Sequence, residues 1–161
     1  ILGMFCGIYH WFPKMYGRYL NNTMAYIHFW VTFAGAYLIF WPMHYEGLAG
    51  MPRRYLDYSS WQSFNMFGDL NRFISTVAMV VFAVQLLFIF NFFYSIFKGR
   101  KVMTQNPWGS TTLEWTAPIR PGHGNWPGEI PEVHRWAYDY GKDGREFIPQ
   151  TEPLGGNESK H

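Results

Sequence analysis

The chain of 161 residues contains a single cysteine, Cys6, and aspartate, glutamate, lysine and arginine together make up only 15% of it. One cysteine excludes a disulfide framework within the chain and a metal cluster built from several thiolates. The formal net charge is +2, and no run of lysine or arginine is present that could follow a nucleic-acid backbone. So low a content of charged residues is typical of a protein in apolar surroundings.

Charge is missing altogether from two long stretches. Residues 23–43 contain no charged side chain and one histidine, His28, and residues 73–97 have Gln85 and Asn91 as their only strongly polar groups. Helices of these lengths would run about 31 and 37 Å, which is enough to cross a hydrocarbon core of about 30 Å. The pattern therefore predicts two complete membrane-spanning helices.

Residues 1–12 are also apolar but cover only about two-thirds of a membrane span. Pro13 follows them, with Trp11 and Phe12 beside it, as in a helix that emerges at a membrane interface. We interpret this segment as the second half of a membrane helix whose first half is absent. The predicted fold is an all-α membrane protein with helices at about 1–12, 23–43 and 73–97, forming part of a longer chain.

Basic residues set the predicted topology. Those of the first connection and those that follow the last span must lie on one side of the membrane, and the positive-inside rule makes that side cytoplasmic. They are Lys14, Arg18, Lys98, Arg100 and Lys101. The connection 44–72 is then on the outer, periplasmic side. Residues 98–161, rich in proline, glycine and tryptophan without apolar periodicity, predict an extended cytoplasmic tail ordered against a partner surface.

The outer connection contains two adjacent arginines, Arg53 and Arg54, in a stretch that Gly50 and Pro52 make turn. Neighbouring side chains on an extended backbone point to opposite faces, so the pair can hold two separate anions. Arginine binds carboxylate or phosphate through two parallel hydrogen bonds. Lipid phosphates, pairing with Asp57, and a bound acidic cofactor are the alternatives that the residues leave open.

Four blocks of sequence, in this order along the chain, resemble subunit I of the haem-copper cytochrome c oxidases, and the last resembles its bacterial form. They are GIYHWFP at 7–13, LNNT at 20–23, GLAGMPRRYLDY at 47–58 and NPWGSTTLEW at 106–115. The resemblance covers residues 1 to about 140. It implies that the three helices are the last three of a twelve-helix bundle, the first of them truncated.

The resemblance implies that Arg53 and Arg54 bind the propionates of two haems at the outer side of the membrane. The expected cofactors are haem a, haem a3 and the copper CuB, with calcium and magnesium as further ions of the assembly. The family's haem and copper ligands precede Ile1, so we expect no catalytic residue and no ligand of the redox centre in this segment. Asp57 corresponds to a position near a structural calcium site in some members, although a salt bridge to an arginine is a simpler interpretation.

Small and apolar residues form a stripe at helical spacing in the second helix, which suits either a flat macrocycle or another helix. The resemblance favours haem contact for Thr32 and Ile39 on this stripe, and for Ser75 and Met79 on the last helix. His28 lies in mid-span, where an ionisable group suggests a function, and its family counterpart lies beside a proposed water-filled proton path. Asn22 stands where the animal enzyme has an acidic residue, so a neutral His28 hydrogen-bonded to a neighbouring helix is the simpler interpretation.

The resemblance implies a function in the catalytic subunit of a respiratory terminal oxidase of the aa3 type, which reduces O2 to water and pumps protons. The expected partners are the rest of subunit I, subunits II and III, the lipid bilayer of the bacterial inner membrane, and cytochrome c as electron donor. A respiratory supercomplex is the larger assembly that these partners would allow. Two alternatives remain: a quinol oxidase of the same superfamily, and a non-catalytic three-helix membrane anchor that binds no haem.

Overall fold

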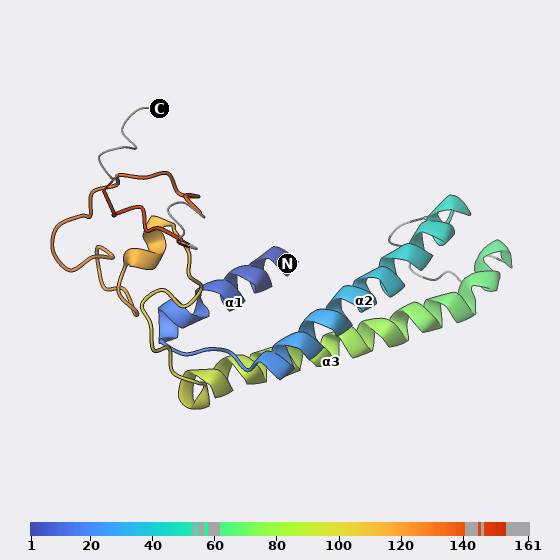
Figure 1. Ribbon diagram of the computed structural model, residues 1–161. Coiled ribbons are helices and arrows are strands. Elements are labelled where there is room, and N and C mark those ends of the chain that lie inside the picture. Colours follow the sequence, from blue (N-terminus) through green and yellow to red (C-terminus); the bar gives the residue numbers. More distant parts are fainter. Residues whose placement is uncertain (53, 55–56, 58–61, 141–144, 146, 154–161) are drawn as a thin grey trace. The chain divides into compact units, whose positions relative to one another are not determined.

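The computed structural model describes residues 1–52, 54, 57, 62–140, 145 and 147–153. Its regular elements, drawn in Figure 1, are the α-helices α1 (Leu2–Tyr16), α2 (Asn22–Leu48) and α3 (Gly68–Lys98), and the short 3-10 helices η1 (Gln62–Phe67) and η2 (Leu113–Thr116). Within these described ranges there is no strand, and β-pairing is confined to two isolated bridges. The predicted all-helical class is confirmed.

The chain divides into two compact units, one of residues 1–20 with 95–161 and the other of residues 21–94. Helix α1 therefore belongs with the tail, and α2 belongs with most of α3. We predicted a boundary near residue 97 between a membrane region and a cytoplasmic tail. This boundary differs from the division into compact units, and it stays a prediction about which residues lie in the bilayer.

Helix α1 runs past the proline at which we expected it to end. Pro13 lies inside the helix, and the chain leaves it at Gly17, whose φ of 67° is left-handed and whose N–H donates to the Pro13 carbonyl. A proline removes only one helical hydrogen bond, whereas a left-handed glycine with this bond is a common helix end. The glycine, not the proline, terminates α1.

Helices α2 and α3 also extend beyond the predicted spans. The Asn21 side chain accepts a hydrogen bond from the Met24 N–H at 3.2 Å and caps the start of α2, which continues five residues past the predicted end at 43. Helix α3 begins at Gly68, five residues before the predicted start. Both α2 and the segment Gln62–Lys98 are long and apolar enough to cross a membrane.

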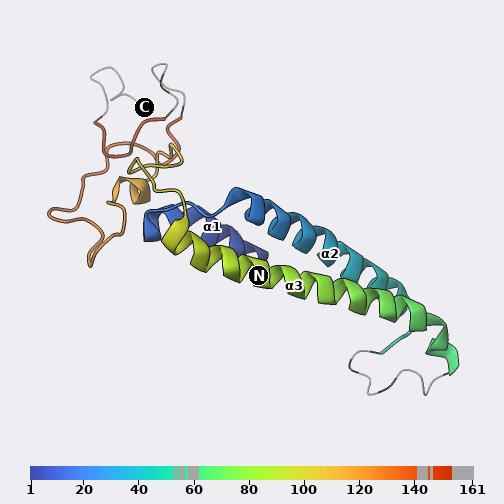
Figure 2. The ribbon, with the colours of Figure 1, turned by 90° about the horizontal axis from the view of Figure 1, so that it is seen from below.

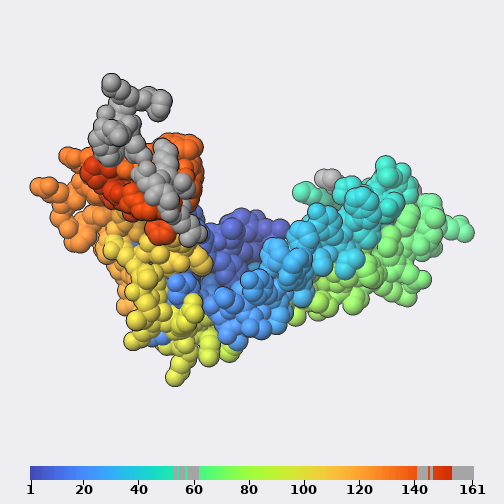
Figure 3. Space-filling view, viewed as in Figure 1, coloured from blue at the N-terminus to red at the C-terminus, as the bar shows by residue number. Residues whose placement is uncertain are grey.

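Within the second unit, α2 and α3 lie side by side and run in opposite directions in both views of the ribbon (Figures 1 and 2). Gly35 of α2 lies so close to Val81 of α3 that a Cβ on Gly35 would collide with the valine side chain. Small residues permit such close helix packing in lipid, where apolar burial between helices contributes little. Figure 3 shows the atoms of α2 and α3 packed against each other along this pair.

Most of the large side chains on this helix pair point outward. Trp30, Phe40 and Trp41 of α2 are 59–62% exposed, and Phe82 of α3 is 63% exposed. A helix that is apolar on every face belongs in a membrane or inside a larger protein. The exposed aromatic surface therefore agrees with a membrane location.

The first unit has its own small core. Its buried apolar side chains are Phe12, Leu20, Trp115, Ala117 and Ile148. A buried ion pair supports it from the tail, because Arg135 donates to Asp139 at 3.2 Å while both side chains are at most 5% exposed. The described part of the tail is thus ordered against α1 and against itself.

Candidate functional site

The end of α2 and the chain that follows it form a pocket of about 880 Å³. Its lining is mainly apolar, with three polar side chains among nine residues: Phe40, Met43, His44, Glu46, Gly47, Leu48, Met51, Pro52 and Arg54. Pockets of this kind, with an apolar wall and a few polar groups, are typical of cofactor sites. Arg54 is the only member of the predicted arginine pair whose structure is described, since Arg53 lies outside the described residues.

Arg54 occupies an unusual backbone conformation. Its φ is 59°, in the left-handed region that non-glycine residues visit at a cost of about 1 kcal/mol. Gly50, four residues earlier, has a φ of 89° and needs no such expense of energy. Backbone strain of this type gathers at binding sites, where the surrounding structure holds a side chain in a required direction. The Arg54 guanidinium is exposed and lines the pocket.

Two further polar groups of the pocket come from the last turns of α2. The His44 Nδ1 lies 2.6 Å from the Phe40 carbonyl oxygen, and because a carbonyl only accepts, Nδ1 carries the proton. Glu46 is 5% exposed, and among the residues that the structure describes its Oε1 has no hydrogen-bond partner. A buried acceptor without a donor costs free energy, so this carboxyl suits a pocket that receives a polar group. The sequence did not single out Glu46.

The four predicted haem-contact residues do not line this pocket. Thr32 is buried at 8% exposure and faces α3, Ile39 is half-buried, and Ser75 and Met79 are exposed on α3. Their contact with haem stays a prediction. Asp57 is exposed, and its place near a calcium ion also stays a prediction. Among the residues that the structure describes, no group of three or more histidine, cysteine or acidic side chains could hold a metal ion.

A buried polar network joins α2 to α3 at mid-span. The Gln85 Nε2 donates to the Thr32 Oγ1 at 3.0 Å and to the Val81 carbonyl at 3.1 Å. A carbonyl accepts only, so this end of the Gln85 amide is the NH2 group and the other end is the oxygen. That oxygen lies 3.0 Å from the His28 Nε2. His28 must therefore donate from Nε2, which fixes its protonated nitrogen.

The hydrogen bond from His28 to a neighbouring helix is the simpler of the two interpretations that the sequence offered. The His28 ring is 2% exposed and stacks on Phe88 of α3 at a centroid distance of 5.0 Å. A second polar pair lies further along the same helices, where Asn91 donates to the Asn21 carbonyl and accepts from its N–H, each at 3.1 Å. These contacts fix the register of α2 on α3. A proton path through His28 stays a prediction.

Replacing Gln85 by leucine should destabilise the α2–α3 pair, because the His28 N–H loses its acceptor while it remains buried. We expect a loss of about 1–2 kcal/mol in the free energy of unfolding, measured by thermal denaturation of the purified complex. The double variant His28→Leu/Gln85→Leu should recover much of this loss, since an apolar pair leaves no buried donor unmatched.

Thr76→Val is the matched control for this change, because within the described residues the Thr76 hydroxyl bonds only to the Arg72 carbonyl of its own helix. Thr76→Val should lower the free energy of unfolding only slightly. Two results would contradict a stabilising His28–Gln85 hydrogen bond between α2 and α3. One is equal destabilisation by Thr76→Val and Gln85→Leu. The other is a His28→Leu/Gln85→Leu variant whose loss of stability equals the sum of the losses in the single variants.

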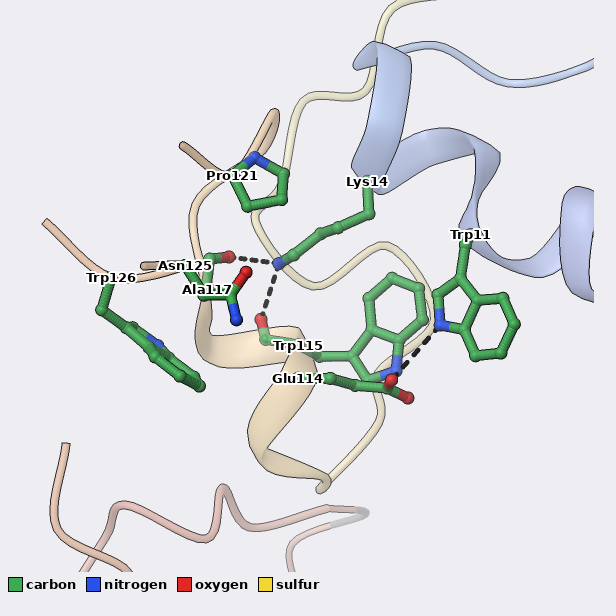
Figure 4. A pocket seen from close by; sticks show the side chains of 8 residues that line it. All are labelled: Trp11, Lys14, Glu114, Trp115, Ala117, Pro121, Asn125 and Trp126. Atoms are coloured by element: carbon green, nitrogen blue, oxygen red, sulfur yellow. Dashed lines mark hydrogen bonds between the residues drawn. The ribbon is translucent and has the colours of Figure 1, made fainter. Parts of the chain in front are cut away.

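A third arrangement, in the first unit, is centred on Lys14 (Figure 4). The Lys14 side chain is buried at 6% exposure, and its ammonium donates to the carbonyls of Gln105, Trp115 and Ala117. It also lies 5.5 Å from the centre of the Trp115 ring. Burial lowers the pKa of the Lys14 ammonium below its usual value, an effect that the Glu114 carboxylate opposes. All three donors of the ammonium are used.

Lys14 lines a small pocket of about 190 Å³, and three of the seven other lining residues are tryptophans. The Trp11 Nε1 donates to Glu114 at 3.2 Å across it, as the dashed line in Figure 4 shows. The sequence predicted Lys14 only as a charge on the cytoplasmic side. Only the structure reveals that the Lys14 ammonium binds three carbonyls of the tail.

The sequence matches the family described as cytochrome c and quinol oxidase polypeptide I over residues 1–80. It is 51% identical over 150 residues to the alternative cytochrome c oxidase subunit 1 of Bradyrhizobium diazoefficiens, covering 91% of this chain and 25% of that protein. Cytochrome c oxidase subunit 1 of Thermostichus vulcanus is 37% identical over 147 residues, with the same coverage. The corresponding protein of Synechocystis is 41% identical over 140 residues, covering 87% and 24%. The chain thus spans about a quarter of the length of these relatives.

Proposed function

Because this chain belongs to the cytochrome c and quinol oxidase polypeptide I family, we propose that it forms the outer haem-propionate end of the catalytic subunit of a terminal oxidase. The observation that supports this most directly is the pocket at the end of α2, where an exposed, conformationally strained Arg54 lies beside a mainly apolar wall. The proposed activity of the complete enzyme is the reduction of O2 to water, with cytochrome c as donor and protons pumped across the membrane.

The described residues fit a flat apolar group with an acidic edge. The side chains of Phe40, Met43 and Leu48 supply apolar wall, and the Arg54 guanidinium can accept a carboxylate in a two-pronged bond. The carboxyl of Glu46, whose Oε1 has no hydrogen-bond partner in the described part of the chain, lies in the same lining and can share a proton with an acid held there. Haem, when bound, supplies the electron transfer, and its propionates supply the acidic edge.

The part played by this chain is positional and electrostatic. Arg54, and by the resemblance Arg53, would hold the ionised propionates and stabilise their charge where water is partly excluded. Haem a, haem a3 and CuB would take their ligands from the remainder of subunit I, which α2 and α3 would join through their exposed apolar faces. Subunits II and III, with the calcium and magnesium ions, complete the proposed assembly.

The proposed location is the bacterial inner membrane, with the connection 44–72 on the periplasmic side. Lys98, Arg100 and Lys101 after α3, together with Arg18 after α1, support a cytoplasmic position for the opposite end of the helices. The two long apolar helices support the proposed location in a membrane.

Optical spectroscopy tests the proposal. A complex purified through an affinity tag on this chain should show a strong Soret band and haem a absorption, and it should oxidise reduced cytochrome c. A complex without Soret absorption would reject the haem assignment and favour a membrane anchor. Haem absorption with oxidation of quinol but not of cytochrome c would reassign the donor and leave the haem pocket in place.

A further inference from the structure

Four basic residues gather where the chain leaves α3. Lys98 is the last residue of α3, Arg100 and Lys101 follow it, and Arg18 lies on the segment after α1. All four belong to the same compact unit. We call them the basic junction.

The backbone holds the two segments of the basic junction side by side. The Tyr19 N–H donates to the Arg100 carbonyl at 2.9 Å, and the Val102 N–H donates to the Gly17 carbonyl at 3.0 Å. Arg18 and Lys101 are thereby opposed in an antiparallel bridge. This is the pair type without mutual hydrogen bonds, in which opposed side chains lie closest and on the same face.

The bridge thus places two cationic residues directly opposite each other. Opposed cations destabilise such a pairing, yet the local backbone is built for it. A Cβ on Gly99 would lie 2.6 Å from the Tyr19 carbonyl oxygen, so only glycine permits the close approach. A bound anion between Arg18 and Lys101 would remove the repulsion.

Within the described residues, no carboxylate supplies that anion, since none of the four basic side chains takes part in an ion pair there. Arg18 donates to the Gly99 carbonyl at 2.6 Å, which uses one of its five N–H groups. Arg100 lies over the Tyr19 ring at 4.7 Å. Lys98 and Lys101 are exposed.

The surroundings indicate which kind of anion would fit the basic junction. The basic junction begins at the last residue of an apolar segment long enough to cross a membrane, Gln62–Lys98. Phe97 beside it is 71% exposed and Met103 is 90% exposed. A ligand with a negative headgroup and acyl chains would meet both the cations and this apolar surface, whereas a free anion would meet only the cations.

We propose that the basic junction binds the phosphate of an anionic phospholipid, held between Arg18 and Lys101. Lys98 and Arg100 add positive charge at the level of the headgroups, where each basic residue strengthens binding of anionic lipid by about five-fold. The inference rests on the proposed membrane location, but it does not depend on the haem pocket.

Native mass spectrometry of the delipidated complex tests this proposal by titration with phosphatidylglycerol and, separately, with phosphatidylcholine. Wild type should bind the anionic lipid more tightly, and Lys101→Gln should lower that preference by about five-fold. Lys101→Arg should keep it. Arg145→Gln, which removes a charge already paired with Glu152 at 2.7 Å, is the matched control and should also keep it.

Lys101→Glu separates lipid binding from folding. It should form an ion pair with Arg18, leave the melting temperature unchanged or higher, and abolish the preference for phosphatidylglycerol. An unchanged lipid preference in Lys101→Gln and Lys101→Glu would overturn the proposal. So would a melting temperature lowered by Lys101→Glu with lipid binding intact, because the cations would then pair with acidic groups elsewhere in the complex. Displacement of the lipid by inorganic phosphate at equal concentration would assign the junction to a free anion and also overturn it.

The haem spectrum of the same samples keeps the two proposals apart. A normal Soret band with no lipid preference rejects the lipid site alone. Loss of the Soret band in wild type rejects the haem assignment and leaves the lipid titration as it stands.

Discussion

Replacing Arg54 by alanine should lower the reduction potential of a haem in the purified complex by on the order of 50 mV. A reduced haem carries one positive charge fewer than an oxidised one, so a nearby cation stabilises the reduced state. A unit charge at about 10 Å in a medium of effective dielectric constant 20 contributes about 1.7 kcal/mol, or about 70 mV for one electron. Partial hydration and movement of the propionate reduce this effect. Spectroelectrochemical titration measures the shift.

Three companion variants make the Arg54 result specific. Arg54→Lys keeps the charge but loses the planar fork, and it should shift the potential less than alanine does. Arg54→Gly removes the side chain and relieves the left-handed backbone, so a potential lowered in glycine and alanine variants alike reports the guanidinium and not a distorted loop. Arg72→Ala is the control, because Arg72 is 83% exposed and pairs with Asp69.

A potential that stays the same in Arg54→Ala and Arg54→Gly, within the error of the Arg72→Ala control, would contradict the propionate assignment. Complete failure of the alanine variant to assemble, with Arg54→Lys assembling normally, would support a role for the cation in haem retention. The tested property is then the haem content of the membranes and not the potential.

The second large effect is expected at Lys14. Methionine retains the apolar stem of the side chain but leaves the Gln105, Trp115 and Ala117 carbonyls without the ammonium that now binds them. Leaving buried acceptors unmatched costs about 3 kcal/mol in total. The tail should then open about 100 times more often, and limited proteolysis in the tail should accelerate in proportion when opening and closing are fast.

Lys98→Met is the matched control for Lys14→Met, because it removes the same charge from an exposed position at the end of α3. It should leave cleavage of the tail unchanged. If the tail of Lys14→Met resists proteolysis as well as that of wild type, the three carbonyls find other donors. The hypothesis that Lys14 holds the tail would then be rejected. Hydrogen exchange of the amides at 105–117 gives an independent measure of the same opening.

Much of the fold follows from the sequence because lipid imposes a simple rule on it. A backbone in a hydrocarbon core must satisfy its hydrogen bonds within itself, so an uncharged run of sufficient length becomes a helix. Residues 23–43 and 73–97 are helical, as this rule requires. The helix ends did not follow from it, since α2 continues through Pro42 to residue 48 and α1 continues through Pro13. Those ends depend on caps and on partners that lie far away in the chain.

The tail shows the clearest limit of sequence patterns. Its lack of apolar periodicity predicted an extended segment on a partner surface, which stays a prediction, and it gave no sign that the described part of the tail packs against α1. The orphan carbonyls at the end of α1 explain this, because the tail supplies their donors: the Arg120 N–H bonds to the Lys14 carbonyl at 2.7 Å, and the Arg120 side chain bonds to the Tyr16 carbonyl at 3.1 Å. No periodicity reveals such a contact between residues a hundred positions apart.

The sequence by itself determined the helical class and the family, and it predicted the arginine pair as a site, because each of these depends on local composition or on contiguous motifs. Only the tertiary structure decided that Gln85 fixes the protonated nitrogen of His28, that Glu46 faces the pocket of Arg54, and that Lys14 is buried. It also decided that Arg18 opposes Lys101. Hydrogen bonds and charge pairs depend on distances of a few ångströms between segments, and those distances exist only after the helices have packed.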